Sequence, residues 1–174
     1  MMEEAPDAVT YRAWRVHGYE PGSQPSLDWL PLASPGPGQV RIRVLASAVS
    51  FVDLLLAGGG YQWKPPTPFV PGSEFSGVID ALGTGDTLGL RVGDRVCGTH
   101  QGSWTDMLCL PATAVGRLGN ADQAPKDRDW AIEAAALMAP YATALYALRE
   151  RAHLRAGETL LVLGATGSVG HAAV

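Results

Sequence analysis

The sequence has few cysteines and no apolar segment that would direct the chain to a membrane or anchor it there. The two cysteines among 174 residues, Cys97 and Cys109, form no ligand-like pair, so we predict free, structural thiols in a reducing compartment. The first residues, MMEEAPDAVTYR, are acidic and lack the apolar core of a signal peptide. No apolar run approaches the ~18 residues of a membrane span. These absences predict a cytoplasmic protein with no membrane partner.

Charged residues are also scarce. They make up 17% of the chain and give a formal net charge of −4, whereas globular domains usually contain ~25%. The basic residues that do gather, Arg149, Arg151 and Arg155, are interleaved with Glu150, which is typical of a solvent-facing helix end. The sequence therefore predicts no nucleic-acid partner.

Glycine and proline are abundant by contrast, with 21 and 13 copies spread along the chain. The segments between them are short and rich in strand-forming residues. In VRIRVLASAVS, Val40, Ile42 and Val44 fall on one face and Arg41 and Arg43 on the other, which is the pattern of a half-buried strand. The pattern predicts a small β-barrel or sandwich, with strands within 9–18, 27–33, 40–50, 74–83, 92–98 and 102–112.

A short helix is predicted after residue 50. Ser50 and Asp53 have the S-x-x-D spacing of a capping box, in which the hydroxyl accepts a hydrogen bond from the third backbone N–H of the helix. The glycines at 58–60 then end the helix. A cap at Ser50 needs no ligand to explain it.

The last third of the chain is alanine-rich. We predict a helix that begins at Asp129 and breaks at Pro140, a second helix that starts at that proline, and a strand at 159–163. This change of composition predicts two domains, a β-rich unit at 8–126 and the start of an α/β unit at 127–174.

The chain closes on LLVLGATGSVGHAAV, which is typical of the strand, glycine turn and helix that begin a dinucleotide-binding domain. Gly164 precedes Ala165, which takes the first glycine position of G-x-G-x-x-G. Gly167 would let the backbone approach a pyrophosphate, and Gly170 would let the helix pack closely. An ordinary strand–turn–helix is the alternative from the motif alone. The residue that reads the ribose would lie ~20 residues further on, after Val174.

Taken in order, these pieces resemble the medium-chain dehydrogenase/reductase superfamily, and most of all its zinc-free quinone oxidoreductase (zeta-crystallin-like) branch. The resemblance covers about residues 10–174 and runs through SFVDLLLAGGGYQWKPPTPFVPGSEFSGVI, VGDRV, EAAALMAPYATALYAL and AGETLLVLGATGSVGHAAV. It implies a mostly β GroES-like barrel that carries the substrate site, followed by the first strand and helix of an incomplete Rossmann domain. We therefore expect a piece of a longer protein, with a functional short form as the alternative.

The resemblance also predicts that zinc is absent. Zinc-dependent members place Cys where Ser50 stands and Gly-His-Glu where Gly72-Ser73-Glu74 stands, and their structural zinc takes four cysteines. Zinc prefers Cys, His or carboxylate ligands in tetrahedral array. Ser50 and Ser73 cannot supply the Cys and His ligands of the catalytic zinc. Two cysteines are too few for the structural zinc. In Gly93-Asp94-Arg95-Val96, another family motif, we expect a β-turn with a structural ion pair.

Three side chains match positions in the family's cofactor cleft. Tyr61 is similar in place to the proton donor of enoyl-thioester reductases, or it packs beside Trp63. Ser50 matches an Asn that contacts the nicotinamide, although we favour the cap. Thr143 matches a Thr that hydrogen-bonds the carboxamide or the substrate, or it bonds its own helical turn. The predicted cofactor contacts are Ser50, Thr143, Gly164, Ala165, Gly167, Val169 and Gly170.

For the longer protein, the resemblance implies an NADPH-dependent oxidoreductase of the quinone reductase type, with NADH as an alternative cofactor. Hydride would pass to a small molecule, either a quinone or an activated C=C or C=O. An enoyl-thioester reductase and a catalytically inactive β-barrel module are the rival hypotheses. We expect a homodimer for the longer protein. For the 174-residue chain itself we expect negligible NADPH binding and self-association.

Overall fold

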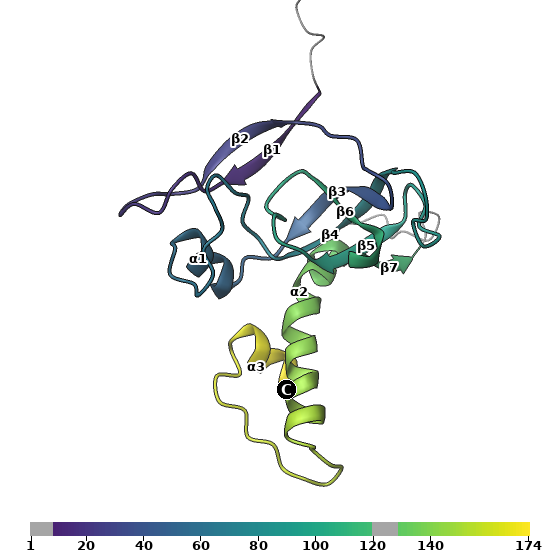
Figure 1. Ribbon diagram of the computed structural model, residues 1–174. Helices are drawn as coiled ribbons and strands as arrows, with labels where there is room; N and C mark the ends of the chain where they lie inside the picture. The colour runs from purple at the N-terminus through teal and green to yellow at the C-terminus, as the bar shows by residue number, and fades with distance from the viewer. Residues whose placement is uncertain (1–8, 120–128) are drawn as a thin grey trace, which may run out of the picture.

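The computed structural model describes residues 9–119 and 129–174. Two antiparallel β-sheets lie together at one end, and a long helix leads away from them to the C-terminal segment (Figure 1). The strands are β1 (Thr10–Arg15), β2 (Ser26–Pro31), β3 (Gln39–Ser47), β4 (Glu74–Leu82), β5 (Arg95–Thr99), β6 (Met107–Pro111) and β7 (Gly116–Gly119). The helical segments are α1 (Phe51–Ala57), η1 (Ala112–Ala114), α2 (Asp129–Leu145), η3 (Tyr146–Arg151) and α3 (Ser168–Ala173).

The larger sheet has the strand order β6-β3-β4-β5-β7, and it confirms the alternation predicted for residues 40–44. Val40 and Ile42 are fully buried, whereas Arg41 on the opposite face donates a hydrogen bond of 2.6 Å to Asp80. Removal of these apolar side chains from water is the main stabilising contribution to the sheet. The buried core consists of Val40, Ile42, Phe75, Ile79, Leu90, Val96, Leu108, Leu110 and Ala112.

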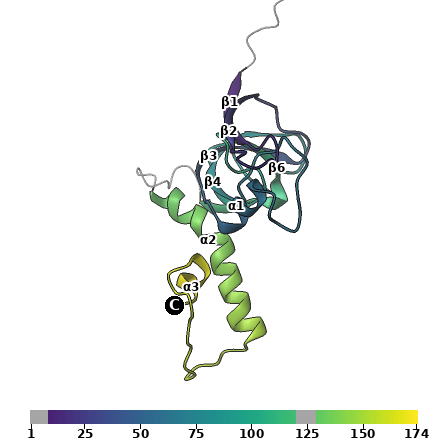
Figure 2. The ribbon, with the colours of Figure 1, turned by 90° about the vertical axis from the view of Figure 1, so that its left-hand side faces the viewer.

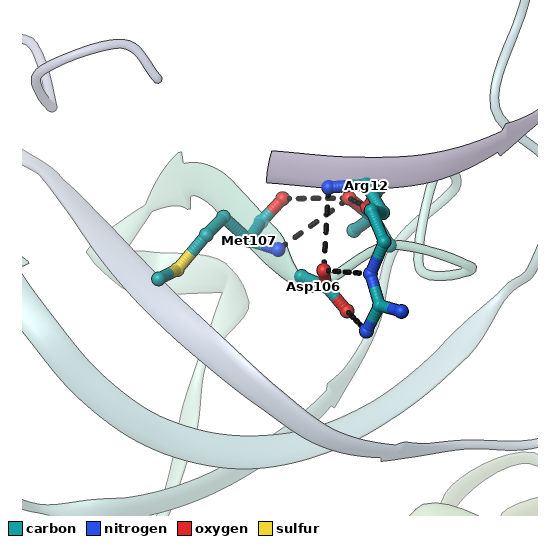
Figure 3. A network of polar contacts seen from close by, with 4 residues as sticks. Arg12, Asp106 and Met107 are labelled. Atoms are coloured by element: carbon teal, nitrogen blue, oxygen red, sulfur yellow. Dashed lines mark hydrogen bonds and ion pairs between the residues drawn. The ribbon is translucent and has the colours of Figure 1, made fainter. Parts of the chain in front are cut away.

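The smaller sheet is the hairpin of β1 and β2, and side chains of Arg12 and Asp106 fasten it to the start of β6. The Arg12 Nε donates to Asp106 Oδ2 at 2.9 Å and its Nη2 donates to Oδ1 at 3.3 Å. Figure 3 shows the guanidinium and the carboxylate side by side, with Met107 next along the chain. Because both groups are exposed, this ion pair positions the hairpin more than it stabilises the fold. A backbone hydrogen bond of 2.9 Å from Trp14 to Trp104 extends the connection.

The turn before β5 confirms the interpretation of Gly93-Asp94-Arg95-Val96. Asp94 is buried, and its Oδ2 accepts from the Arg91 N–H at 2.9 Å and lies 3.7 Å from Arg117 Nη1. The aspartate therefore closes a turn and forms a structural ion pair.

Helix α2 corrects the prediction at Pro140. The helix runs without interruption from Asp129 to Leu145, with Pro140 inside it, and η3 continues it to Arg151. Proline removes one N–H from the helical hydrogen-bond series, and its ring clashes with the carbonyl of the preceding turn, so an interior proline kinks a helix where it does not break it. Figure 2 shows the change of direction along α2.

The strand predicted at 159–163 does not form. Residues 158–162 have no regular structure, and Leu161 and Leu163 are 79% and 85% exposed. A strand of a parallel sheet needs hydrogen-bonded neighbours on its edges, and the described residues place none beside this segment. The predicted domain boundary, between 126 and 127, lies outside the described residues.

One continuous helical stretch, Asp129–Arg151, is long and apolar enough to cross a membrane by length and composition, with a mean hydropathy of 1.3 and 28% of its apolar window buried. The prediction that no segment approaches this length was therefore wrong on length. The core helix of a water-soluble domain passes the same test. The N-terminal half of α2 has this character, because Ala131, Ala134 and Ala135 are buried where α2 packs against β3, β4 and β5.

Candidate functional site

The predicted capping box at Ser50 is confirmed in full. Ser50 Oγ accepts from the Asp53 N–H at 3.2 Å, and Asp53 Oδ2 accepts from the Ser50 N–H at 2.8 Å. The Ser50 hydroxyl also donates to Asp53 Oδ2 at 2.8 Å. The cap fixes the start of α1 and holds Ser50 half-buried at the end of the sheet.

A second buried carboxylate, Glu74, was not predicted as a site residue. Glu74 is the first residue of β4, is 3% exposed, and accepts a hydrogen bond of 2.7 Å from the Ala139 N–H of α2. Burial raises the pKa of Glu74 above its ordinary value of 4.5; the Ala139 N–H opposes this rise, and the charge of Asp53 adds to it. The sequence signal was an acidic residue at the start of a mostly apolar strand, which also contains Ser76 and Asp80.

Tyr61 lies in the loop that follows α1, half-buried. The loop is held by Tyr19, whose hydroxyl donates to the Pro65 carbonyl at 2.6 Å and whose ring packs against Gly59. Gly59 has a φ of +69°, so its backbone conformation favours glycine at this close contact. The chain therefore has a defined path on both sides of Tyr61, and Trp63 nearby is 52% exposed.

Thr143 is exposed on α2, one turn after Pro140. The next helix, α3, packs against α2, so Thr143 and the glycine turn belong to the same part of the molecule. Ser50 and Tyr61 belong to the other part. Ser50 precedes the first residue of α1, and Tyr61 lies in the loop that follows α1. The bend of α2 therefore lies between the two groups of predicted site residues.

The glycine turn closes as the motif predicts, although no strand leads into it. Gly164 has a φ of +75°, and its carbonyl accepts from the Gly167 N–H at 3.0 Å. A Cβ on Gly170 would lie 2.2 Å from that same carbonyl oxygen, so only glycine fits there. Ala165, Gly167 and Val169 are exposed, and α3 begins with no side-chain cap at Gly167. The turn thus presents bare backbone to solvent.

Two hollows in the described parts of the chain lie away from the predicted site residues. One, of about 450 Å³, lies between α2 and α3 and is lined by residues such as Glu133, Tyr141 and His171. The other, of about 750 Å³, lies between the hairpin, the end of β3 and the 103–106 loop. None of the predicted site residues lines either hollow in the described ranges. The larger apolar residues that line the hollow of about 750 Å³ are Trp14, Leu27, Val44, Val49 and Trp104.

Within residues 9–119 and 129–174, no group of three or more His, Cys, Asp or Glu side chains is arranged to hold a metal ion. Ser50 stands beside Asp53, and Ser73 precedes Glu74, where zinc-dependent proteins of this type carry Cys and His. The absence of zinc stays a prediction from the donor set.

Residues 36–142 match the family model described as the alcohol dehydrogenase GroES-like domain. The mouse synaptic vesicle membrane protein VAT-1 homolog-like is 35% identical over 167 residues, which cover 95% of this chain and 38% of that protein. The quinone oxidoreductase-like protein 2 homolog of Nematostella vectensis is 38% identical over 80% of this chain and 36% of its own. The phthioceranic/hydroxyphthioceranic acid synthase of Mycobacterium tuberculosis is 41% identical over 80% of this chain, but only 6% of that synthase.

Solved structures show the same similarity. The human VAT-1 homolog-like protein superposes with a TM-score of 0.82 at 33% identity, over 95% of this chain and 51% of that one. A mycobacterial protein solved with NADPH has a TM-score of 0.76 at 30% identity, over 94% of this chain and 48% of that one. The chain therefore spans about half the length of these structures and less of the curated relatives.

Proposed function

Because the chain belongs to the medium-chain dehydrogenase/reductase superfamily, with a GroES-like domain and quinone oxidoreductase-like relatives, we propose that it supplies the GroES-like part of an NADPH-dependent oxidoreductase of the quinone reductase type. Its substrate would be a small molecule, a quinone or an activated C=C or C=O. We propose further that the longer protein is a cytoplasmic homodimer and that its reaction needs no zinc.

The glycine turn carries this proposal. Its exposed backbone closes through Gly164 and Gly167, and Gly170 leaves no room for a side chain. A pyrophosphate needs such a close approach to backbone N–H groups, so the residues present fit the phosphate end of a dinucleotide. The similar mycobacterial structure with NADPH supports the nature of the cofactor. One turn holds a small part of a dinucleotide, which is why we expect negligible binding to this chain alone.

The side chains of Thr143, Ser50 and Tyr61 would position the cofactor and the substrate and protonate the product. NADPH, when bound, supplies the hydride. The Thr143 hydroxyl would donate a hydrogen bond to the carboxamide or the substrate carbonyl. The Ser50 hydroxyl, whose one O–H donates to Asp53, would accept a hydrogen bond from the carboxamide N–H group. Tyr61 would donate a proton to the reduced product and regain one from water, which its place in a half-buried loop permits.

An enoyl-thioester reductase is the second candidate, because the chain is 41% identical to part of the phthioceranic/hydroxyphthioceranic acid synthase and 39% identical to part of the pikromycin polyketide synthase component PikAII of Streptomyces venezuelae. Both candidates use the same hydride donor and differ in the acceptor. An inactive β-barrel module is the third, and it predicts no turnover at all.

The test uses a longer protein that carries this chain together with a complete dinucleotide-binding domain. NADPH oxidation is measured with a quinone and with an enoyl thioester. Turnover of the quinone alone supports the first candidate and turnover of the thioester alone the second, whereas no oxidation with either acceptor would leave the inactive module.

Tyr61→Phe in the same protein removes the phenol and keeps the ring. A positioned proton donor contributes about 10²–10⁴-fold to rate, so we expect kcat to fall by about 10²-fold or more with NADPH affinity unchanged. Trp63→Phe is a matched aromatic control in the same loop and should leave kcat within a few-fold. Unchanged kinetics for Tyr61→Phe would remove Tyr61 from the mechanism.

A further inference from the structure

The hollow of about 750 Å³ beside the hairpin, here called the hairpin hollow, is separate from the predicted site residues. Its walls come from β1 and β2, the end of β3 and the 103–106 loop. Its volume falls within the range of about 300–1,000 Å³ that is usual for small-molecule sites. Ser50, Tyr61 and Thr143 do not line it. The proposed oxidoreductase reaction therefore leaves this hollow without a role.

One wall of the hairpin hollow is a firmly held indole, that of Trp104. The indole N–H donates to the Ala48 carbonyl at 3.0 Å. The backbone N–H of Trp104 donates to the Pro71 carbonyl at 3.0 Å, and its carbonyl accepts from the Trp14 N–H at 2.9 Å. Gly72 lies so close that a Cβ there would clash with the indole. A ring held in this way is ready for a ligand, which lowers the entropic cost of binding.

The hairpin supplies a second wall. Trp14 and Leu27 are cross-strand partners in β1 and β2, so their side chains share one face of the hairpin. Both line the hollow, and they are 46% and 47% exposed. Arg12, two residues before Trp14, shares that face and lines the hollow too. Burial of this exposed surface favours an apolar ligand, and the two indoles favour a flat one.

The hydroxyl groups that line the hollow use their protons within the protein. Ser47 Oγ donates to the Glu74 carbonyl at 2.8 Å. The hydrogen between Ser47 Oγ and Ser103 Oγ, which are 2.8 Å apart, therefore belongs to Ser103. Thr105 Oγ1 donates to a neighbouring backbone carbonyl. A ligand finds no hydroxyl donor in these three residues.

The side-chain donors that remain among the described lining residues all belong to the hairpin: Arg12, Trp14 and Gln24. Arg12 Nε and Nη2 donate to Asp106, whereas Nη1 has no hydrogen-bond partner in residues 9–119 and 129–174 and points away from the carboxylate (Figure 3). The Arg12 side chain is 52% exposed, so a ligand reaches Nη1. Because Asp106 already balances the charge of Arg12, the matching ligand group is a neutral acceptor. A carboxylate would also meet the charge of Asp106.

We propose that the hairpin hollow binds a flat, apolar small molecule that carries a neutral hydrogen-bond acceptor, such as an aromatic ketone. The rings of the ligand lie against Trp14 and Trp104, and its oxygen accepts from Arg12 Nη1. The site is one of binding alone, and it does not rest on the proposed function.

The test is an NMR titration of the ¹⁵N-labelled 174-residue chain with 2-acetylnaphthalene, followed at the tryptophan indole N–H signals. The Trp14 and Trp104 signals should shift together and saturate, whereas those of Trp63 and Trp130 should stay in place. 2-Ethylnaphthalene keeps the rings and lacks the acceptor, so it should bind about three- to tenfold more weakly, the effect of one hydrogen bond. 2-Naphthoate should also bind more weakly than the ketone.

Two variants separate the wall from the donor. Trp14→Ala should weaken both neutral ligands by about tenfold or more, because an aromatic wall is lost. Trp63→Ala removes a similarly exposed indole near Tyr61 and should change neither affinity. Arg12→Met keeps an unbranched side chain and removes the guanidinium, so the preference for the ketone should disappear while 2-ethylnaphthalene binds as before. Since the pair of Arg12 and Asp106 is exposed, this variant should fold, and it decides the case if Trp14→Ala does not.

Several results would overturn the proposal. Equal affinities for the ketone and the ethyl compound, or tighter binding of the naphthoate, would contradict the neutral acceptor. Binding that Leu161→Lys with Leu163→Lys removes would place the ligand on the exposed C-terminal surface instead. Loss of binding in the longer protein would show that the rest of that protein covers the hollow. No readout needs NADPH, so a failure of the proposed function would be seen separately.

Discussion

At the scale of single residues, one hydroxyl organises the start of α1. Ser50 Oγ accepts the Asp53 N–H and donates to the Asp53 carboxylate, so it satisfies a helix N–H and a buried acid together. Four backbone N–H groups at a helix start have no partner within the helix, and a side-chain acceptor for one of them is worth about 1 kcal/mol. Because α1 has only seven residues, this one cap is a large share of its local stability.

Ser50→Ala removes both contacts and should lower the free energy of unfolding by about 1–2 kcal/mol, in the upper part of the range for lost caps because Asp53 is buried. Urea denaturation followed by circular dichroism measures the change. Ser50→Asn is the matched control, since Asn caps helices as well as Ser does. Equal losses for Ala and Asn would show that the hydroxyl, and not the cap, matters here.

At the scale of elements, the glycine turn and α3 form one closed unit. The Gly164 carbonyl accepts from Gly167, and the Gly167 carbonyl accepts from His171 at 2.8 Å. The unit packs against α2 although its predicted strand is absent, which shows that the turn and the strand form independently. Local backbone geometry is sufficient for the turn, because its hydrogen bonds span only a few residues.

Gly170→Ala should open this unit. The new Cβ would lie 2.2 Å from the Gly164 oxygen and 2.8 Å from its carbonyl carbon, so backbone must move, at a cost of about 1–3 kcal/mol. We expect the His171 amide to exchange with solvent at least several-fold faster. Gly167→Ala is the control, because its Cβ meets the same oxygen at 3.4 Å and its φ of −80° suits any residue. Similar exchange in both variants would argue against steric exclusion at Gly170.

At the scale of the whole molecule, the C-terminal part exposes an apolar surface that the sheet does not cover. Ile132 and Leu145 on α2 are 64% and 53% exposed, and Leu161 and Leu163 are more exposed still. Apolar surface of this extent on a water-soluble chain usually marks an interface. In a parallel α/β sheet, neighbouring strands and helices would cover such residues.

The 174-residue chain should therefore self-associate. Sedimentation velocity over a range of concentrations should show species heavier than one chain, with a weight-average coefficient that rises with concentration. Leu161→Lys with Leu163→Lys should reduce the association, whereas Leu82→Lys, on the sheet, should not. A single, concentration-independent monomer boundary for the unaltered chain would contradict this prediction.

Much of the fold could be predicted because short-range chemistry decides it. The alternation in β3 and the capping box at Ser50 are set by residues two to four positions apart, and the structure confirms both. The ion pair at Asp94 involves the more distant Arg117, but its turn is local. For the candidate site, the sequence indicated Ser50, Tyr61, Thr143 and the glycine turn, and their roles stay predictions.

What only the tertiary structure decided depends on partners far along the chain. Whether TLLVL becomes a strand depends on neighbouring strands, and without them the same residues stay irregular. A proline inside a helix can kink it or end it, and α2 continues through Pro140. The hydrogen bond from the Ala139 N–H to the buried Glu74 joins segments 65 residues apart in the sequence. Local patterns determine elements; burial and pairing between distant segments determine which of those elements persist and which side chains meet.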